Sequence, residues 1–115
     1  MTRKPFSVSV RRLPALAILD LQGEIDSFAE QDLNAAYAQA DSYGLEKIVL
    51  NFQEVEYINS TGIALIVGLL AQARKRHRSL AVYGLSEHYV EIFNITRLSD
   101  FMTIYPDEQS VFSLG

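Results

Sequence analysis

The sequence contains no cysteine and only two histidines, His77 and His88. The lack of cysteine excludes a disulfide framework, a thiolate zinc site and a cysteine nucleophile. Two histidines are too few for a histidine-rich metal site. Long apolar runs are also missing, since the longest, Gly62 to Ala71, is far shorter than the roughly 18 residues that cross a bilayer. The sequence therefore predicts no metal, no cofactor and no membrane insertion.

Positive charge is also scarce. Ten lysines and arginines stand against 14 aspartates and glutamates, and the net charge of −4 argues against nucleic-acid binding. The basic residues at the start of the chain have no apolar segment behind them, so they do not predict a signal peptide. With 49% hydrophobic and 21% charged residues, the 115-residue chain has the balance of one packed domain, residues 1–115. We expect a cytoplasmic protein.

Apolar periodicity predicts strands and a helix in the first part of the chain. Alternating apolar residues from Phe6 to Val10 and the run Leu16–Leu21 predict two strands joined as a hairpin, with Gly23 breaking the pattern. Ser27-Phe28-Ala29-Glu30 has the form of a capping box for a helix. We expect that helix to end at Gly44.

The rest of the chain continues the alternation of strands and helices. The apolar run Ile48–Phe52 is typical of a central strand that is covered on both faces. The later elements are expected as a long helix to about His77, a strand at Leu80–Tyr83, a short helix capped by Ser86, an edge strand at Met102–Tyr105 and a terminal helix opened by Pro106. The order β-β-α-β-α-β-α-β-α predicts an α/β fold, with a mixed, mostly parallel sheet of about five strands packed with four α-helices.

The most informative segment is Asn59-Ser60-Thr61-Gly62, at the expected start of the long helix. If Ser60 were the N-cap, no hydrophobic staple could form. If Asn59 is the N-cap, Ile58 and Ile63 occupy the two positions whose side chains pack together across a helix start. We favour the second frame, which leaves Ser60 at the first helical position with a free and exposed hydroxyl.

This placement suits a phosphate group. A helix N-terminus offers unpaired N–H groups and about half a positive charge, and a phosphoserine carries about −1.5 to −2 charges at neutral pH. Ser60 is therefore a candidate switch residue. The alternative is that the tetrapeptide only starts a helix. The helix body at Ile63–Ala71 is apolar around nearly its whole circumference, so either neighbouring elements or a partner must cover it.

The remaining charged residues have structural explanations. The basic run Arg74–Arg78 lies where cations complement the negative end of a helix dipole, which disfavours a role in binding phosphate or RNA. Asp20, Glu24 and Asp26 form an acidic group near a strand end. Solvation and capping explain them, and alternatively they rim a recognition surface close to Ser60.

Motifs of catalysis are missing from the sequence. It contains no phosphate-binding loop, no dinucleotide-binding motif and no nucleophile elbow. Neither histidine is expected near Ser60, so a serine nucleophile would have no base. The sequence therefore predicts a protein that is not an enzyme.

The pattern as a whole resembles a STAS domain of the bacterial anti-sigma factor antagonist family. The resemblance covers nearly the full chain. It rests on Gly23-Glu24-Ile25-Asp26, on the stretch Ile48–Ile58 leading into Asn59-Ser60-Thr61-Gly62, on Arg97-Leu98-Ser99-Asp100-Phe101 and on Ile104-Tyr105-Pro106-Asp107-Glu108. The resemblance implies the STAS fold for residues 1–115.

The resemblance also implies a partner switch controlled by phosphorylation. In that family the unphosphorylated antagonist binds an anti-sigma factor that is also a serine kinase, and this frees the sigma factor. The kinase phosphorylates the first hydroxyl residue of the motif, here Ser60, with Thr61 as a secondary candidate, and a serine phosphatase resets the switch. The implied partner-binding residues are Glu24, Asp26, Asn59, Ser60, Thr61, Gly62 and Ile63.

One residue departs from the family pattern, which usually has aspartate where this sequence has Asn59. Asparagine caps a helix as well as aspartate does, so the expected fold is unchanged. The missing carboxylate removes a contact that a kinase could use. An alternative use of the same fold is as an accessory or scaffold module of a transporter or a larger signalling complex, in which Ser60 is never modified.

Overall fold

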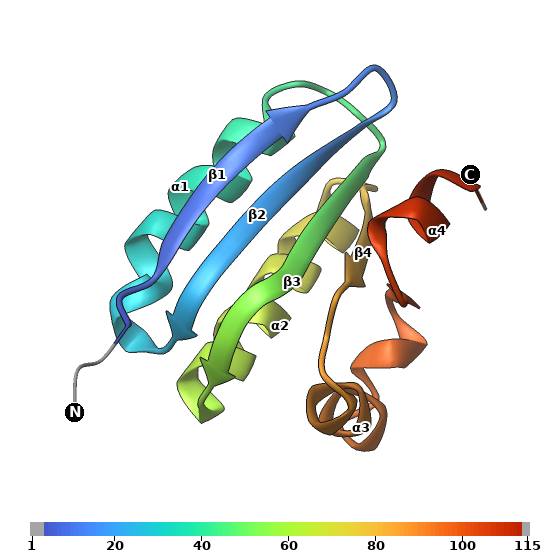
Figure 1. Ribbon diagram of the computed structural model, residues 1–115. Coiled ribbons are helices and arrows are strands. Elements are labelled where there is room, and N and C mark those ends of the chain that lie inside the picture. The colour runs from blue at the N-terminus through green and yellow to red at the C-terminus, as the bar shows by residue number, and fades with distance from the viewer. Residues whose placement is uncertain (1–3, 114–115) are drawn as a thin grey trace.

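One mixed sheet organises the computed structural model, which describes residues 4–113 (Figure 1). Its five strands lie side by side in chain order: β1 (Ser7–Arg12), β2 (Leu16–Ile25), β3 (Lys47–Ile58), β4 (Ser79–Tyr83) and β5 (Thr103–Tyr105). β1 runs antiparallel to β2, and the other neighbours are parallel. The predicted mixed, mostly parallel sheet is confirmed.

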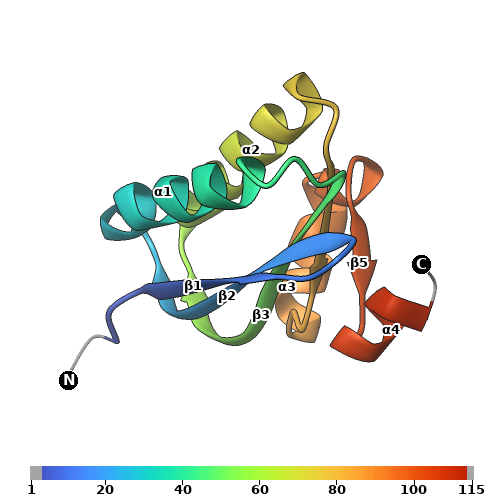
Figure 2. The ribbon, with the colours of Figure 1, turned by 90° about the horizontal axis from the view of Figure 1, so that it is seen from above.

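Helices connect the parallel strands, because a parallel pair requires a crossover. α1 (Glu30–Asp41) follows β2, α2 (Ser60–Lys75) follows β3, α3 (Glu87–Ile95) follows β4 and α4 (Glu108–Ser113) follows β5. A short 3-10 helix, η1 (Ser27–Ala29), precedes α1, and a second, η2 (Leu98–Asp100), follows α3. Figure 2 shows α1 and α2 together on one face of the sheet. The order of elements predicted from the sequence is confirmed.

The central strand β3 contributes side chains to two apolar cores. Ile48, Leu50 and Phe52 face the larger core, between the sheet and the helices α1, α2 and α3. Val49 faces a smaller core on the opposite side, which Val111 of α4 helps to close. All five side chains are buried. Burial on both faces explains the unbroken apolar run and confirms the predicted central strand.

The second half of β3 extends past its neighbour β4. Pairing with β4 ends at Asn51 opposite Tyr83, whereas pairing with β2 continues to Ile58 opposite Ile25. β3 therefore carries the chain to the far end of β2 before α2 begins. This extension brings the end of β2 and the start of α2 together.

The prediction that Gly23 breaks the second strand is wrong. Gly23 has a φ of +85° at a shift in the register between β2 and β3, and β2 continues through it to Ile25. A Cβ at this position would lie 2.3 Å from the carbonyl oxygen of Pro5. Glycine is thus needed because the chain before β1 crosses closely over the bulge.

The predicted capping box at Ser27 is also wrong. The N-cap is Asp26, one residue earlier, and its carboxylate accepts a hydrogen bond of 3.0 Å from the N–H of Phe28. This cap starts η1, and α1 begins after it at Glu30 without a side-chain cap. Aspartate and serine are equally good caps, so the local sequence could not decide between the two frames.

Candidate functional site

Asn59 caps α2 in the frame that the sequence favours. Its Oδ1 accepts a hydrogen bond of 2.9 Å from the N–H of Gly62, and its own N–H donates to the carbonyl oxygen of Ile25 at 3.2 Å. The backbone of Asn59 is extended, with φ −89° and ψ −178°. Because Asn59 serves as the cap, the Ser60 hydroxyl is not needed to cap the helix.

Ser60 is the first residue of α2, and its side chain is exposed. Among residues 4–113 the structure gives the Ser60 hydroxyl no hydrogen-bond partner. Thr61, at the next position, is exposed as well. Both hydroxyl groups are therefore open to a visiting enzyme, and the predicted exposure of Ser60 is confirmed.

Gly62 brings β2 and α2 into direct contact. It is buried, and a Cβ on it would lie 2.1 Å from the carbonyl oxygen of Ile25 and 2.8 Å from Cγ2 of Ile58. Only a residue without a side chain allows this approach. Gly62 therefore holds the end of β2 beside Ser60, although the two segments are far apart in the sequence.

The implied partner-binding residues gather at this junction. Glu24 and Asp26, both half-buried, lie at the end of β2, and Asp26 also caps η1. η1 contacts α2. Ile63 is half-buried and packs on the larger core, so its role is mainly structural. The structure thus brings together Glu24, Asp26, Asn59, Ser60, Thr61, Gly62 and Ile63.

Two exposed aromatic side chains border the same junction, and the sequence did not indicate them. Phe28 in η1 is 78% exposed, and Tyr57 near the end of β3 is 52% exposed. Tyr57 pairs in register with Glu24. Exposed aromatic side chains are enriched at interfaces. The one indication in the sequence that Phe28 lies at this junction is its position two residues after Asp26.

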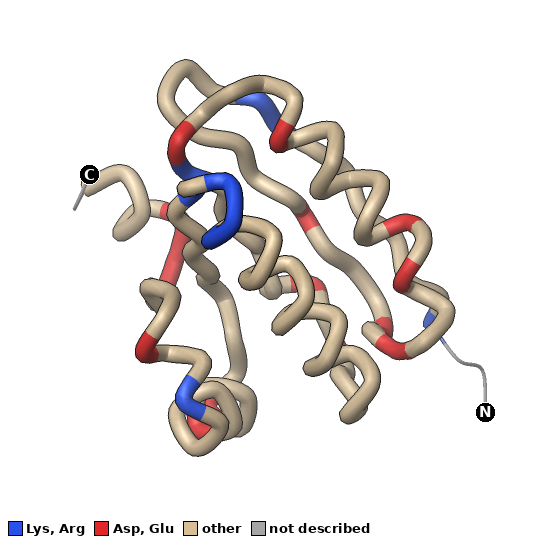
Figure 3. The backbone as a smooth tube through the Cα atoms, turned by 180° about the vertical axis from the view of Figure 1, so that it is seen from behind, with Lys and Arg blue, Asp and Glu red and all other residues tan. Residues whose placement is uncertain are grey.

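Neighbouring elements cover one side of the apolar body of α2 and leave the other side exposed. Ile66, Leu69, Leu70 and Ala73 are buried against the sheet and its neighbours. Ala64, Val67, Gly68 and Ala71 form an exposed apolar stripe that starts beside Ser60. Figure 3 shows α2 without charge along most of its length and with basic residues only at its C-terminal end. One side of α2 thus remains open to a partner.

Three arginines of the basic run at the end of α2 contact other parts of the protein. Arg76 and Arg78 both bind Asp41 at the end of α1, with N–O distances of 2.7 and 2.9 Å. The guanidinium carbon of Arg74 lies 4.8 Å from the centre of the Phe101 ring. These three arginines thus connect the end of α2 to α1 and to Phe101, which follows η2.

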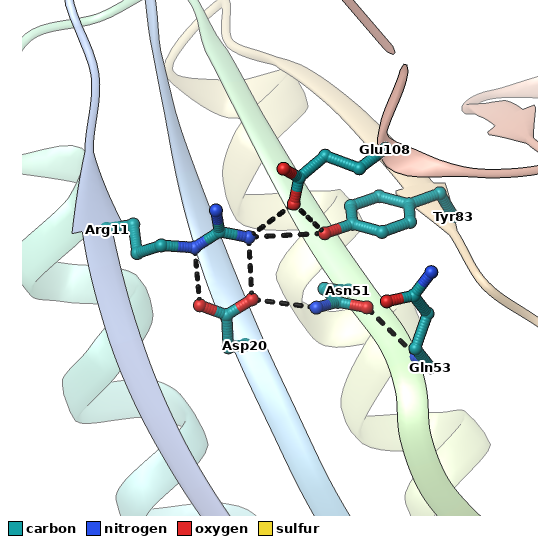
Figure 4. Close-up of polar contacts among 6 residues, drawn as sticks. All are labelled: Arg11, Asp20, Asn51, Gln53, Tyr83 and Glu108. Carbon is teal, nitrogen blue, oxygen red and sulfur yellow. Dashed lines mark hydrogen bonds and ion pairs between the residues drawn. The ribbon is translucent and has the colours of Figure 1, made fainter. Parts of the chain in front are cut away.

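A polar network joins α4 to the strands on the face of the sheet opposite to α1 and α2 (Figure 4). Arg11 donates to Asp20 and to Glu108, each at 2.6 Å, and the Tyr83 hydroxyl also donates to Glu108 at 2.6 Å. Asn51 donates to Asp20 at 2.7 Å. The bonds from Arg11 and Tyr83 hold the pKa of Glu108 below its ordinary value.

This network divides the acidic group that the sequence suggested. Asp20 belongs to the network and serves to anchor Arg11, whereas Glu24 and Asp26 lie near Ser60. His77 and His88 are exposed, at the end of α2 and in α3. In residues 4–113 no helix is long and apolar enough to span a membrane, and no cluster of side chains is arranged to hold a metal ion.

Comparisons with known proteins give a consistent result. The model of the STAS domain family matches residues 7–111. An anti-sigma-B factor antagonist of Staphylococcus epidermidis is 30% identical over 82 residues, which make up 71% of this chain and 76% of that protein. The same identity and coverage hold for the anti-sigma-B factor antagonist of Staphylococcus aureus strain COL.

Solved structures with the same architecture are more distant in sequence. An anti-sigma factor antagonist from Mycobacterium paratuberculosis has a TM-score of 0.81 and 16% identity, and the match covers 96% of this chain and 93% of that one. The phosphorylated form of the Bacillus cell fate determinant SpoIIAA has a TM-score of 0.72 and 18% identity, covering 95% and 100% of the two chains. At these identities the likeness shows a shared fold.

Proposed function

Because this chain belongs to the STAS domain family and to its anti-sigma factor antagonists, we propose that it binds an anti-sigma factor that is also a serine kinase. Antagonists of this kind are regulatory proteins without enzymatic activity. In its unphosphorylated form the chain holds the anti-sigma factor and so frees the sigma factor for transcription. Phosphorylation of Ser60 by the kinase dissociates the complex.

The exposed hydroxyl of Ser60 at the first position of α2 is the observation that supports this proposal best. Asn59 provides the side-chain cap of α2, so the cap does not depend on the Ser60 hydroxyl. A phosphate on Ser60 would lie at the positive end of the helix dipole, where an anion is favourable. The modification is therefore compatible with the folded domain.

The same phosphate would disrupt a packed interface. A group with about −1.5 to −2 charges is repelled and desolvated when it meets a partner surface that fits an uncharged serine. A cost of about 3 kcal/mol weakens binding more than about a hundredfold. We place the partner on the surface formed by Glu24, Asp26, Asn59, Ser60 and Thr61, with the exposed rings of Phe28 and Tyr57 at its margin. Gly62 and Ile63 support this surface from beneath.

The remaining steps of the cycle follow from this chemistry. Because a phosphoserine is stable towards water, a serine phosphatase is needed to restore the unmodified form. Both the kinase and its ATP belong to the cytoplasm, where we place this chain. Thr61 is the second candidate for modification, since its hydroxyl is also exposed.

Incubation with the cognate kinase and ATP, followed by intact-mass measurement, tests the proposal. We expect one added phosphate on the unchanged chain and on Thr61→Ala, and none on Ser60→Ala. Phosphate on Ser60→Ala but not on Thr61→Ala would move the site to Thr61. If no variant gains mass although the kinase phosphorylates a known substrate, the chain is an unmodified scaffold module.

A further inference from the structure

The exposed apolar side of α2 leads into a groove farther along the helix from Ser60. This groove, of about 490 Å³, lies between α2 and the segment around η2. Val67, Leu70 and Ala71 line it from α2, and Leu98 and Phe101 line it from the other side. An exposed apolar surface of this kind often marks an interaction site.

The groove exposes large apolar side chains. Val67 is 43% exposed and Phe101 is 52% exposed, so both leave much apolar area in contact with water. Single exposed apolar residues are common, but a group of them around one concave surface is typical of an interaction site.

The rim of the groove is positive, although the chain as a whole is negative. Arg74 stacks on the ring of Phe101, and the ion pairs found in residues 4–113 do not include it. Arg97 binds Asp100 at 2.7 Å. Two arginines and one aspartate leave one net positive charge here, whereas the whole chain carries −4. The groove is thus suited to an apolar group accompanied by a carboxylate.

The backbone beside the groove turns sharply where α3 ends. Arg97 has a φ of +67°, in the left-handed region that favours glycine. This conformation starts η2 and puts the arginine on the groove, next to Leu98. Arg97 directly follows Thr96, the C-cap of α3, where a left-handed residue commonly ends a helix, so this turn shapes the wall of the groove.

The groove continues the open side of α2 that begins at Ser60. Ala64, Val67 and Ala71 follow Ser60 at spacings of three and four residues, so they share one side of the helix. With a rise of about 1.5 Å per residue, Val67 lies about 10 Å along the axis from Ser60. A standard interface buries about 800 Å² on each partner and reaches across this distance.

We infer that this groove receives a short segment of the same anti-sigma factor, with an apolar side chain next to an acidic residue. The inference rests on the proposed function, because it assigns the occupant to the partner that binds at Ser60. The apolar side chain packs between Val67 and Phe101, and the carboxylate binds Arg74. The groove is an additional anchor outside the phosphorylation site, which contributes equally to binding of the phosphorylated and unphosphorylated chains.

Calorimetry with the purified cognate anti-sigma factor measures the contribution of the groove to the Kd. Phe101→Ala should weaken binding by about tenfold or more, as loss of an aromatic anchor does. Phe112→Ala is the matched control, since Phe112 is 50% exposed on α4, away from α2. The control should leave the Kd unchanged.

A charge reversal tests the carboxylate separately. Arg74→Glu should weaken binding by about tenfold or more, and raised salt should reduce the difference from the unchanged chain. Lys75→Glu, on an exposed neighbour outside the groove, is the control. Because Arg74 is exposed, this variant remains informative if Phe101→Ala fails to fold.

Two results would overturn the inference while leaving the proposed function intact. In the first, the anti-sigma factor binds and Ser60 is phosphorylated, but the groove variants match their controls. In the second, the chain alone forms dimers in sedimentation that Phe101→Ala abolishes, so the groove holds a second copy. If the anti-sigma factor does not bind the unchanged chain at all, both the proposed function and the groove's occupant are wrong.

Discussion

The hydroxyl of Tyr89 in α3 bonds to both backbone groups of Ile58, the residue before the helix cap. It accepts from the N–H of Ile58 at 2.9 Å and donates to its carbonyl oxygen at 3.3 Å. The next residue, Asn59, donates to β2, so the groups of Ile58 point to the opposite side, where β4 has already ended. Tyr89 thus provides the hydrogen bonds that a neighbouring strand would make, and it holds in place the end of β3 that leads to Ser60.

Replacing this hydroxyl should loosen the start of α2. Tyr89→Phe leaves the N–H and carbonyl groups of Ile58 without a partner, and we expect a loss of about 1–2 kcal/mol in unfolding free energy. Hydrogen exchange at the Ile58 amide should become faster. Tyr57→Phe, on an exposed ring, is the control. Unchanged exchange at Ile58 would show that the two bonds do not hold the strand end.

Two glycines of α2 should respond in opposite ways to the same substitution. Gly62→Ala places a Cβ against the backbone of Ile25, and we expect a loss of about 3 kcal/mol or more. A Cβ on Gly68 would meet no neighbouring atom within 4 Å, so Gly68→Ala should raise the stability by roughly 0.5–1 kcal/mol. Denaturant unfolding measures both. Equal effects would contradict the close contact between β2 and α2.

Substitutions of Asn59 separate capping from recognition. Asn59→Ala removes the bond to Gly62 and should cost about 1 kcal/mol. Asn59→Asp keeps the cap and restores the carboxylate that the family usually carries, so stability should hold while the kinase works faster. Thermal unfolding and the kcat/KM of phosphorylation are the measurements. A slower reaction of Asn59→Asp would mean that the kinase prefers the amide.

Acid should weaken the attachment of α4. Arg11 and Tyr83 lower the pKa of Glu108 in the folded chain, so Glu108 adds stability above its unfolded pKa, near 4.5. That contribution is lost as the pH falls from this value through the lower folded pKa. Unfolding free energy measured against pH should therefore fall less steeply in Glu108→Gln than in the exposed control Glu91→Gln. Parallel curves would exclude this linkage.

Local patterns were sufficient for most of the fold and for the centre of the site. The apolar run at Ile48–Phe52 predicted the central strand, and the pairing of Ile58 with Ile63 across the helix start indicated Asn59 as the cap. Both depend on residues close in sequence. Where two equally good caps stood side by side, as at Asp26 and Ser27, the local pattern gave the wrong frame.

Contacts between distant segments could not be predicted in this way. Tyr89 lies 31 residues from Ile58, and Arg11 lies 97 residues from Glu108. Nothing in the local sequence of either pair indicates its partner. The groove at Phe101 depends on the same kind of information, because α2 and η2 meet only in the folded chain.

Affinity for the anti-sigma factor before and after phosphorylation is the most direct test of the central claim. The chain phosphorylated on Ser60 and the unmodified chain are compared by calorimetry, and the Tm of each is recorded. We predict that phosphorylation raises the Kd more than about a hundredfold while the Tm changes by less than about 3 °C. An equal Kd for the two forms, or a large fall in Tm on phosphorylation, would contradict the account.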